Sequence, residues 1–452
     1  MAARLFSFIE ARNLLFHPYF ERMVLSMKDN TNLKVLETLY VGIDVSKNSN
    51  QTCILTFDGN KLCNFSSANN TDGAKEIEDK ILSLLSKHEC KYVKVVLEST
   101  GIYSLHIANY LSSSESLIKF ETEVFVVNPV TTANYSKVLS IPDKNDPKDA
   151  YALADYVRSG HTKNLKPFRG TQRLALQRLT RHRKHVVELL SAEKTYVLNN
   201  IFLKFSDYNN PKHDTECFSN TFSTTSLAIL SKFKSPEQLA KCKLEKLIDI
   251  IVDAGKNKFK NPDQIAETLK KAARSSYRLD KTSYDSLNIA IASSLALIDC
   301  YEKQIKTIDE AIEKLVKGLD NQNQYKSLIS IPGIGPVYAA GILAEIGDVN
   351  VFKDDSALAK YIGLIWKEHQ SGDFSSDTTR LSKAGNSYLR YYIIEAAGSV
   401  IYCENNYHQF YQKKFNEVTV HQHARALVLT ARKFVRLIYG LMSKDQLYNP
   451  NK

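Results

Sequence analysis

Hydrophobic and polar positions over residues 40–129 alternate between strand and helix patterns. Apolar runs of strand length occur at 40–47, 51–57, 61–65, 92–98 and 122–129. The second and third runs are joined through Asp58-Gly59, a typical hairpin turn. Apolar residues recur at helical spacing over 73–87, and a further helix is expected over 102–112. Three hairpin-connected strands followed by alternating helices and strands predict a mixed α/β sheet.

Strand patterns stop near residue 150, and helical patterns dominate the rest of the chain. Helices are predicted over 171–204, 234–252 and 262–276, with a polar loop at 206–225. A second long helix then places residues at alternating spacings of three and four: Leu287, Ile291, Ser294, Ile298, Tyr301, Ile305, Ile308, Ile312, Leu315 and Leu319. This spacing is typical of a coiled-coil seam. It favours a coiled-coil hairpin or a dimer arm over a single amphipathic helix packed in its own domain.

The patterns divide the chain into four parts. Residues 1–37 form an N-terminal extension that matches no clear module, and residues 38–165 form an α/β domain. Residues 166–322 are predicted to be a helical coiled-coil arm, and residues 323–445 an all-helical C-terminal domain. The predicted fold class is therefore α/β plus α.

Composition narrows the functional classes only slightly. Of the 452 residues, 43% are hydrophobic and 24% charged, which excludes an intrinsically disordered chain. The formal net charge of +11 favours acidic partners such as nucleic acid. The seven cysteines are scattered without a CxxC pair, which argues against a disulfide framework or structural zinc. With no signal-peptide core and no apolar run of about 18 residues, we expect a soluble cytoplasmic protein.

The positive charge is concentrated in one segment of 27 residues that contains no acid. Its nine basic residues are Arg158, Lys163, Lys166, Arg169, Arg173, Arg178, Arg181, Arg183 and Lys184. A run of charge is usually a solvated face, but one of a single sign and this length can also follow the phosphates of a nucleic acid. We therefore expect a nucleic-acid-binding surface at the start of the arm.

Four acidic residues in the first domain occupy positions that suit a metal site. Asp44 lies in the first strand, Glu98 ends the strand at 92–98, and Asp146 and Asp149 lie three apart at the start of a predicted helix. An i, i+3 pair projects from one helix face. Carboxylate oxygens are the ligands that Mg²⁺ takes in two-metal phosphoryl-transfer sites. A strand with Asp, a hairpin, a strand with Glu and a later Asp-x-x-Asp helix predict a ribonuclease-H-like topology.

The order of several motifs resembles one family of recombinases. GIDVSK, LESTGIY, VNPV and NDPKDA resemble the N-terminal DEDD domain of the Piv/MooV-type insertion-sequence transposases and DNA invertases. IPGIGPVYAAGILAEIGD, LAKYIGL, HQSGDF and LSKAGNSYLR resemble the second domain of that family. The resemblance implies a RuvC-like N-terminal domain in which Asp44, Glu98, Asp146 and Asp149 bind Mg²⁺ or Mn²⁺. Asp143 competes for one of these places.

The resemblance also implies a nucleophilic serine in the C-terminal domain. The position that matches the family's Ser-Gly motif is Ser371, in HQSGDF. The family commonly has further Gly and Lys after this motif, whereas Asp373 and Phe374 stand here. The competing serines are Ser375, Ser376 and Ser382, of which Ser382 is the second choice. A serine hydroxyl needs a base or a metal to activate it.

Further DNA contacts are expected in the C-terminal domain. Gly333 and Gly335, in the turn at 331–336, resemble the turn of a helix-hairpin-helix motif, whose backbone amides meet a phosphate. A plain helix-helix turn is the alternative. The basic residues Arg380, Lys383 and Arg390 surround a predicted turn near Ser371, and we expect them to bind the DNA strand there.

Together these features predict a DNA transposase, or site-specific recombinase, of an insertion sequence. The resemblance implies DNA and a non-coding guide RNA as partners, and a homo-oligomer, a dimer or a tetramer, joined by the coiled coil. It also implies a bacterial protein associated with the nucleoid when bound to DNA. Two alternatives remain: a Mg²⁺-dependent endonuclease of the Holliday-junction type that uses water, and an inactive nucleic-acid-binding remnant of a mobile element.

Overall fold

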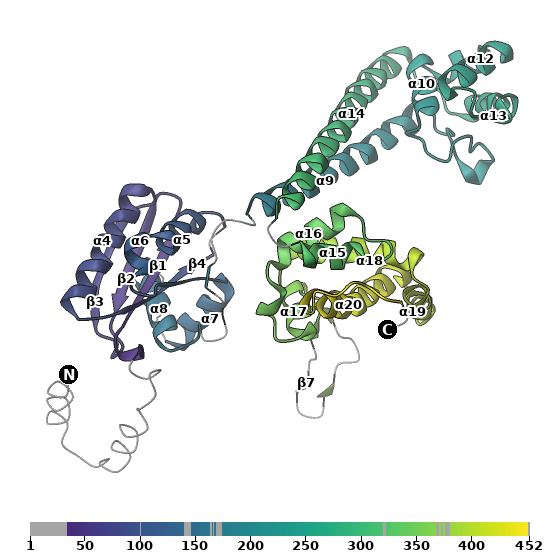
Figure 1. The fold of residues 1–452 in the computed structure, drawn as a ribbon. Coiled ribbons are helices and arrows are strands. Elements are labelled where there is room, and N and C mark those ends of the chain that lie inside the picture. The colour runs from purple at the N-terminus through teal and green to yellow at the C-terminus, as the bar shows by residue number, and fades with distance from the viewer. Residues whose placement is uncertain are drawn as a thin grey trace, which may run out of the picture. The chain divides into compact units, whose positions relative to one another are not determined.

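The computed structural model describes most of the chain in two compact units. It covers residues 34–99, 101–139, 146–162, 165, 167–168, 174–319, 322–367, 370–371, 374–375 and 380–450. The first unit ends at Gln172 and the second begins at Arg173, so the arm and the C-terminal region belong to the same unit (Figure 1). The predicted N-terminal extension lies, up to residue 33, outside the described residues.

The first unit contains a five-stranded sheet. Its strands are β1 (Thr38–Val45), β2 (Ser49–Leu55), β3 (Lys61–Ala68), β4 (Tyr92–Glu98) and β5 (Glu123–Val127). Their order across the sheet is β3-β2-β1-β4-β5, with the first three antiparallel and β1, β4 and β5 parallel. The predicted mixed sheet and its hairpin are confirmed. The central position of β1 follows from pairing with β2 on one side and β4 on the other.

Helices cover both faces of this sheet. Those of the first unit are α4 (Thr71–Lys87), α5 (Ser104–Ser113), α6 (Glu115–Ile118), α7 (Pro129–Val138) and α8 (Asp146–Arg158). Side chains alternate between the faces of a strand. Leu39, Val41 and Ile43 therefore pack with α4 and α5, whereas Tyr40 packs in a second core cluster with α8. The periodicity that predicts α4 also identifies its buried residues.

Gly42 allows α8 to lie directly on the central strand. A Cβ atom added at Gly42 would lie 2.2 Å from the backbone nitrogen of Ala154 and 2.3 Å from the carbonyl oxygen of Ala150. No side chain fits at these distances, so the helix contacts the strand through main-chain atoms. This contact places the N-terminal turn of α8 along the face of the sheet that carries Gly42.

Two long helices form the arm of the second unit, α9 (Leu174–Lys204) and α14 (Lys281–Lys317). They run side by side in opposite directions, as the ion pairs Lys194–Glu302 (2.8 Å) and Arg183–Asp309 (2.5 Å) require. The predicted seam packs against α9, with Ile291, Ile298 and Ile312 buried. The coiled-coil hairpin is thus observed within one chain. Neither helix, nor any other in the described ranges, is long and apolar enough to cross a membrane.

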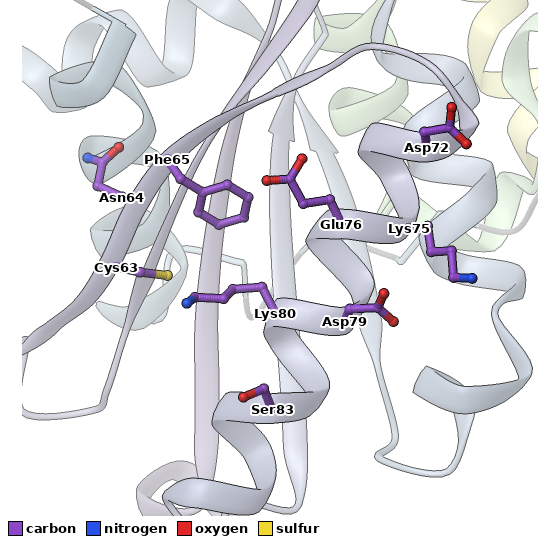
Figure 2. A pocket seen from close by; sticks show the side chains of 9 residues that line it. All are labelled: Cys63, Asn64, Phe65, Asp72, Lys75, Glu76, Asp79, Lys80 and Ser83. Atoms are coloured by element: carbon purple, nitrogen blue, oxygen red, sulfur yellow. The ribbon is translucent and has the colours of Figure 1, made fainter.

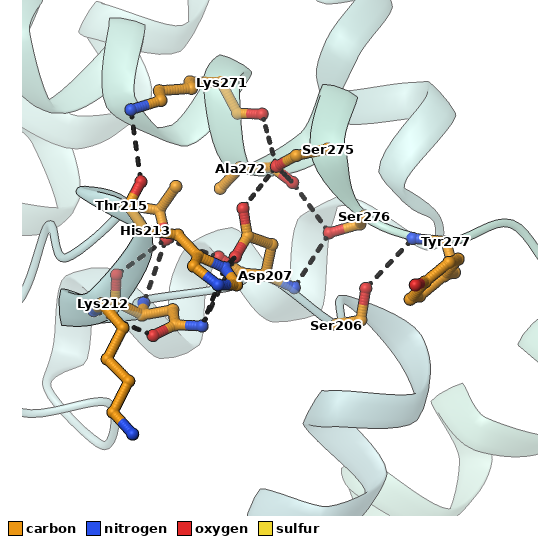
Figure 3. Close-up of polar contacts among 11 residues, drawn as sticks. Ser206, Asp207, Lys212, His213, Thr215, Lys271, Ala272, Ser275, Ser276 and Tyr277 are labelled. Atoms are coloured by element: carbon orange, nitrogen blue, oxygen red, sulfur yellow. Dashed lines mark hydrogen bonds and ion pairs between the residues drawn. The ribbon is translucent and has the colours of Figure 1, made fainter.

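Short helices form the tip of the arm: α10 (Thr224–Lys232), α11 (Pro236–Lys241), α12 (Leu244–Gly255), α13 (Pro262–Ser275) and the 3-10 helix η1 (Pro211–His213). The polar loop that precedes α10 is held by Asp207 (Figure 3). The Asp207 carboxylate accepts hydrogen bonds from the Ser275 hydroxyl and from Nδ1 of His213, the latter at 2.6 Å. The Ser275 and His213 contacts lower the pKa of Asp207 although burial opposes them. The predicted loop is therefore an ordered segment tied to α13.

The C-terminal part of the second unit is mostly helical. Its helices are α15 (Asn323–Ile329), α16 (Pro336–Ile346), η2 (Val349–Val351), α17 (Asp355–Ile362), α18 (Ser387–Cys403), α19 (Asn405–Asn416) and α20 (Gln422–Ser443). The prediction of an all-helical domain was wrong, because two small ladders interrupt it. β6 (Trp366–Lys367) pairs with β9 (Arg380–Leu381), and β7 (Gln370–Ser371) pairs with β8 (Phe374–Ser375). Strands of two residues are too short to produce a periodic pattern.

Lys204 generates a prediction about the stability of the tip. Its ammonium group is buried, donates a hydrogen bond to the Leu230 carbonyl at 2.7 Å, and burial lowers its pKa from 10.5 to about 7. The unfolded chain therefore binds more protons between pH 7 and 10.5, so stability should rise with pH in this range, by about 1.4 kcal/mol per unit. Lys204→Met should remove this dependence in calorimetric unfolding at pH 7, 8.5 and 9.5.

The exposed Lys232 in the same tip offers a matched control. Lys232→Met should keep the pH dependence of the wild type, because it leaves the buried Lys204 in place. An unchanged slope in Lys204→Met would contradict the prediction.

Candidate active site

Asp44 and Glu98 lie side by side at the carboxyl ends of two parallel strands. The register of β1 and β4 pairs Ile43 with Leu97, so the next residue of each strand is one of these two acids. Asp44 shares its face of β1 with Gly42, and Glu98 shares its face of β4 with Val96, because side chains alternate along a strand. Both carboxylates therefore project toward the face covered by α8, and both residues are half-buried.

The Asp-x-x-Asp pair begins the helix that covers this face. Asp146 and Asp149 lie in the first turn of α8, as predicted. They precede the buried residues Ala150 and Leu153 by four positions, which places each acid on the sheet-facing side of the helix. A hydrogen bond of 2.9 Å from the Asn64 amide to the Pro147 carbonyl attaches this turn to β3. All four predicted acids thus belong to one face and one end of the sheet.

Thr132 orients Glu98. The Thr132 hydroxyl, on α7, donates a hydrogen bond of 2.7 Å to Oε2 of Glu98, and Thr132 itself is buried. Sequence reasoning missed Thr132, because the hydrogen bond joins residues 34 positions apart. The only local signal was the Asn128-Pro129 helix start, which predicts a helix here but no contact.

The donor set fits a hard divalent cation in its chemistry, since all four ligand candidates are carboxylates. Asp44 and Asp149 already make polar or electrostatic contacts within the chain. Within the described ranges, no three His, Cys, Asp or Glu side chains converge closely enough to hold a metal ion. The sheet and α8 therefore bring the four acids to one region without closing a coordination shell around it. Asp143 lies outside the described residues.

The predicted basic segment divides into paired and exposed residues. Lys163, Lys166, Arg169 and Arg173 lie outside the described residues. The pairs that the others form are Arg158 with Asp155, Arg181 with Glu345, Arg183 with Asp309 and Lys184 with Glu188. Arg178 is exposed and has no ion-pair partner among the residues the structure describes. It shares one side of α9 with the exposed His182 and His185, because these positions are four and three apart.

The predicted serine lies in a short hairpin of the second unit. Ser371 belongs to β7 and pairs with Phe374 of β8. Ser375 lies in β8, and Ser376 lies outside the described residues. The second choice, Ser382, follows β9, where its backbone N–H donates to the Ile365 carbonyl at 2.8 Å. The Ser382 hydroxyl accepts a hydrogen bond from the Ala384 N–H at 3.4 Å, so this serine is part of a turn.

The three basic residues near the serine differ in their roles. Arg380 lies in β9 and pairs with Lys367, which places it in the ladder at the foot of the hairpin. Lys383 is exposed. The Arg390 guanidinium donates to the carbonyls of Ile362 and Lys383, both at 2.9 Å, and thereby joins the two ends of the segment. The Arg390 side chain therefore binds the protein backbone in this structure.

The two glycines of the turn before α16 have different surroundings. Gly333 has a φ of +91°, and a Cβ atom there would lie 3.0 Å from the backbone of Ser399 in α18. Gly335 precedes Pro336 at the start of α16, and its Cα faces open space. The turn therefore packs one glycine against the domain and exposes the other at the helix N-terminus.

A groove of about 750 Å³ in the first unit is separate from the acidic set. It lies between β3 and α4, and Figure 2 shows the lining side chains Asp72, Lys75, Glu76, Asp79 and Lys80 on α4. The set contains three acids and two lysines, so it carries charges of both signs. Because α4 covers the opposite face of the sheet from α8, this groove takes no part in a site at Asp44 and Glu98.

Comparison with known families identifies both regions that carry the predicted residues. A family model described as transposase matches residues 41–203, which include the four acids. A second model, the transposase IS116/IS110/IS902 family, matches residues 325–412, which include Ser371. The chain belongs to the IS110/IS116 family of transposases. Together the two matches cover more than half of its length.

Curated relatives of the transposase agree with this assignment. A probable family 20 transposase of Pseudomonas aeruginosa is 27% identical over 33% of this chain and 43% of its own length. The insertion element IS116 uncharacterized 44.8 kDa protein of Streptomyces clavuligerus is 22% identical over 92% of this chain and 97% of its own. The pilin gene-inverting protein of Moraxella lacunata is 22% identical over 78% of this chain and 79% of its own. The predicted family is thereby confirmed.

Arg178 and Arg183 of the transposase should respond differently to substitution. Arg178→Ala should weaken binding of duplex DNA and lower the slope of log affinity against log salt by about 1, because one phosphate contact is lost. Arg183→Ala should instead lower the free energy of unfolding by about 1–3 kcal/mol, since Asp309 loses its partner. Salt titrations and thermal melts of both variants separate the two effects. Equal salt slopes for Arg178→Ala and wild type would contradict a phosphate contact.

Proposed function

We propose that this transposase cleaves and rejoins DNA strands at the ends of an insertion sequence, using a divalent metal held by the acidic set and a serine nucleophile. The observation that carries the proposal is the placement of Asp44 and Glu98 side by side on the face that α8 covers with Asp146 and Asp149. This places four carboxylates near one end of one face of the sheet. They suit Mg²⁺ or Mn²⁺, which prefer oxygen ligands.

The residues of the chain have distinct roles in this proposal. Asp44, Glu98, Asp146 and Asp149 would hold the metal, which when bound stabilises negative charge that develops on the phosphate. Thr132 keeps the Glu98 carboxylate in one orientation through its hydrogen bond. Preorganised ligands of this kind need no rearrangement during the reaction.

Ser371 would act as the nucleophile. Its Oγ forms a bond to the phosphorus while a bridging P–O bond of the DNA breaks, and the departing deoxyribose oxygen takes up a proton. The serine proton passes to a base at the site. Attack of a second strand's hydroxyl on the phosphoserine reverses these steps and restores the serine. One phosphoester replaces another at each step, so no external energy source is required.

Guide RNA, duplex DNA and a homo-oligomer are the partners in this proposal. They follow from the family resemblance, and the exposed side of α9 with Arg178, His182 and His185 supports contact with nucleic acid. The pilin gene-inverting protein of Moraxella lacunata, by its name, inverts a gene, which requires that DNA strands be cut and rejoined. This supports the same chemistry for the present chain.

The nucleophile can be tested by trapping a covalent protein–DNA adduct. Wild type, incubated with labelled element ends and Mg²⁺, should yield an adduct that survives denaturing electrophoresis. Asp44→Ala, Glu98→Ala and Ser371→Ala should each abolish it while the protein stays folded. Ser382→Ala, at the turn next to the hairpin, should form the adduct at the rate of wild type.

Two outcomes would contradict the serine mechanism. Strand cleavage without any adduct would indicate water as the nucleophile, as in a Holliday-junction-type endonuclease. Full recombination by Asp44→Ala, Glu98→Ala and Ser371→Ala alike would contradict both the metal site and the serine nucleophile.

Thr132 offers a test of the metal ligands that leaves all four carboxylates in place. Thr132→Val deletes the hydrogen bond to Glu98 at nearly constant volume, and should raise the Mg²⁺ concentration for half-maximal cleavage by about 10- to 100-fold. Thr132→Ser retains the hydroxyl and should stay close to wild type. A Mg²⁺ titration of cleavage rate measures both. An unchanged midpoint in Thr132→Val would show that Glu98 does not bind the metal.

A further inference from the structure

Glu345 is a fully buried carboxylate at the junction of three helices. Its side chain has no exposed surface, although it lies on α16 among apolar neighbours. The Arg181 guanidinium, from α9, donates to both of its oxygens, at 2.7 and 2.9 Å. This hydrogen bonding raises the pKa of Arg181. Burying a carboxylate lowers the free energy of unfolding unless hydrogen-bond partners compensate its charge. Glu345 therefore depends on its contact with Arg181.

Gln177 of α9 also donates to Oε2 of Glu345, at 3.4 Å, and a further donor comes from the residue that ends the segment carrying the hairpin. The Asn386 amide donates to Oε2 of Glu345 at 2.8 Å. The carbonyl oxygen of the same side chain caps α18 by accepting from the N–H groups of Tyr388 and Leu389. Glu345 therefore joins the arm helix α9 to the first turn of α18, where the segment 363–386 ends.

The entry and exit of this segment are held together next to Glu345. The Asn386 N–H donates to the Tyr361 carbonyl at 2.8 Å, and a Cβ atom at Gly385 would lie 2.3 Å from that carbonyl. Gly363, with a φ of +80°, makes a similarly close approach to Ala384. Beyond these contacts, Trp366 pairs with Leu381 in the ladder of β6 and β9. These contacts form the base of the segment that leads to Ser371.

We propose that Glu345 is a positioning residue that fixes the base of the serine-bearing segment to the arm. The inference rests on the proposed function of Ser371, which lies between β6 and β9 in the chain. Asn386 is the connecting residue, because its side chain bonds Glu345 and the start of α18 at once. Loss of the carboxylate charge weakens the hydrogen bond to the Asn386 amide, which also donates to the Tyr361 hydroxyl at 3.2 Å, and leaves the helices folded. The ladder of β6 and β9 and the hairpin of β7 and β8 are then no longer fixed to α9 at their base.

The chain contains a natural reporter of this base. Trp366 is its single tryptophan and lies in β6, at the first pair of the ladder. Its fluorescence and its quenching by acrylamide therefore monitor the base without a label and without DNA. Glu345→Gln keeps the size of the side chain and removes its charge. Asn386→Ser keeps a capping oxygen for α18 but has no amide to reach Glu345.

Both variants should show the same pattern well below their melting temperatures. The acrylamide quenching constant of Trp366 should rise by about twofold or more, because the base opens more often. The rate of adduct formation should fall by about tenfold, since a shift of the nucleophile of order 1 Å is costly. The affinity for DNA should remain within about twofold of wild type.

Asp309→Asn serves as the matched control. It also removes a carboxylate that binds an arginine of α9, but it lies on α14 and, in the described part of the chain, bonds Arg183 rather than Asn386 or the ladder. Its Trp366 quenching and its adduct rate should match wild type. If Glu345 serves stability alone, Glu345→Gln would behave like this control below its melting temperature, and the proposal would be overturned.

The Trp366 measurement separates this proposal from the assignment of Ser371. Increased quenching in Glu345→Gln and Asn386→Ser supports the anchoring even if Ser371→Ala still forms the adduct, in which case only the assignment of the nucleophile fails. Wild-type quenching in both variants overturns the anchoring whatever the result for Ser371→Ala.

Discussion

A single buried carboxylate joins three helices of the second unit of this transposase, α9, α16 and α18. Glu345 has no exposed surface, so its charge requires donors from whatever elements surround it. From α9, Arg181 supplies two hydrogen bonds and Gln177 a third, and Asn386 supplies one from the start of α18. Hydrophobic packing alone would tolerate small shifts between α9, α16 and α18. Hydrogen bonds to a buried charge restrict their geometry, because a lost donor leaves the charge uncompensated.

The basic segment shows how one sequence feature can have two structural roles. From its pattern alone, all nine cations were candidates for binding nucleic acid. In the structure, Arg181 binds Glu345 of α16 and joins the arm to the C-terminal part, Arg183 binds Asp309 of α14 and joins the two arm helices, and Arg178 is exposed on the same helix. The ion-paired and the exposed cations of α9 therefore lie on different sides of the helix. The 3.6-residue period of the helix makes that division possible within seven positions.

Much of the first unit could be predicted because local patterns determine it. The hairpin, the buried strand that ends at Glu98 and the helix that begins at Asp146 agree with periodicity and turn chemistry. Long-range contacts could not be read in this way: the hydrogen bond from Thr132 to Glu98 and the partners of Glu345 depend on the tertiary arrangement. The ladders around Ser371 escaped prediction for another reason. Strands of two residues carry no period, so the polar sequence there resembled a loop.

The close contact at Gly42 has a consequence for how this site tolerates sequence change. The separation between the strand that carries Asp44 and the helix that carries Asp149 is set by main-chain atoms, which every amino acid shares. Substitutions among the core side chains that flank the contact alter packing density but leave this separation nearly unchanged. Substitutions in the surrounding core should therefore change the arrangement of the acids very little. Position 42 itself, however, accepts only glycine.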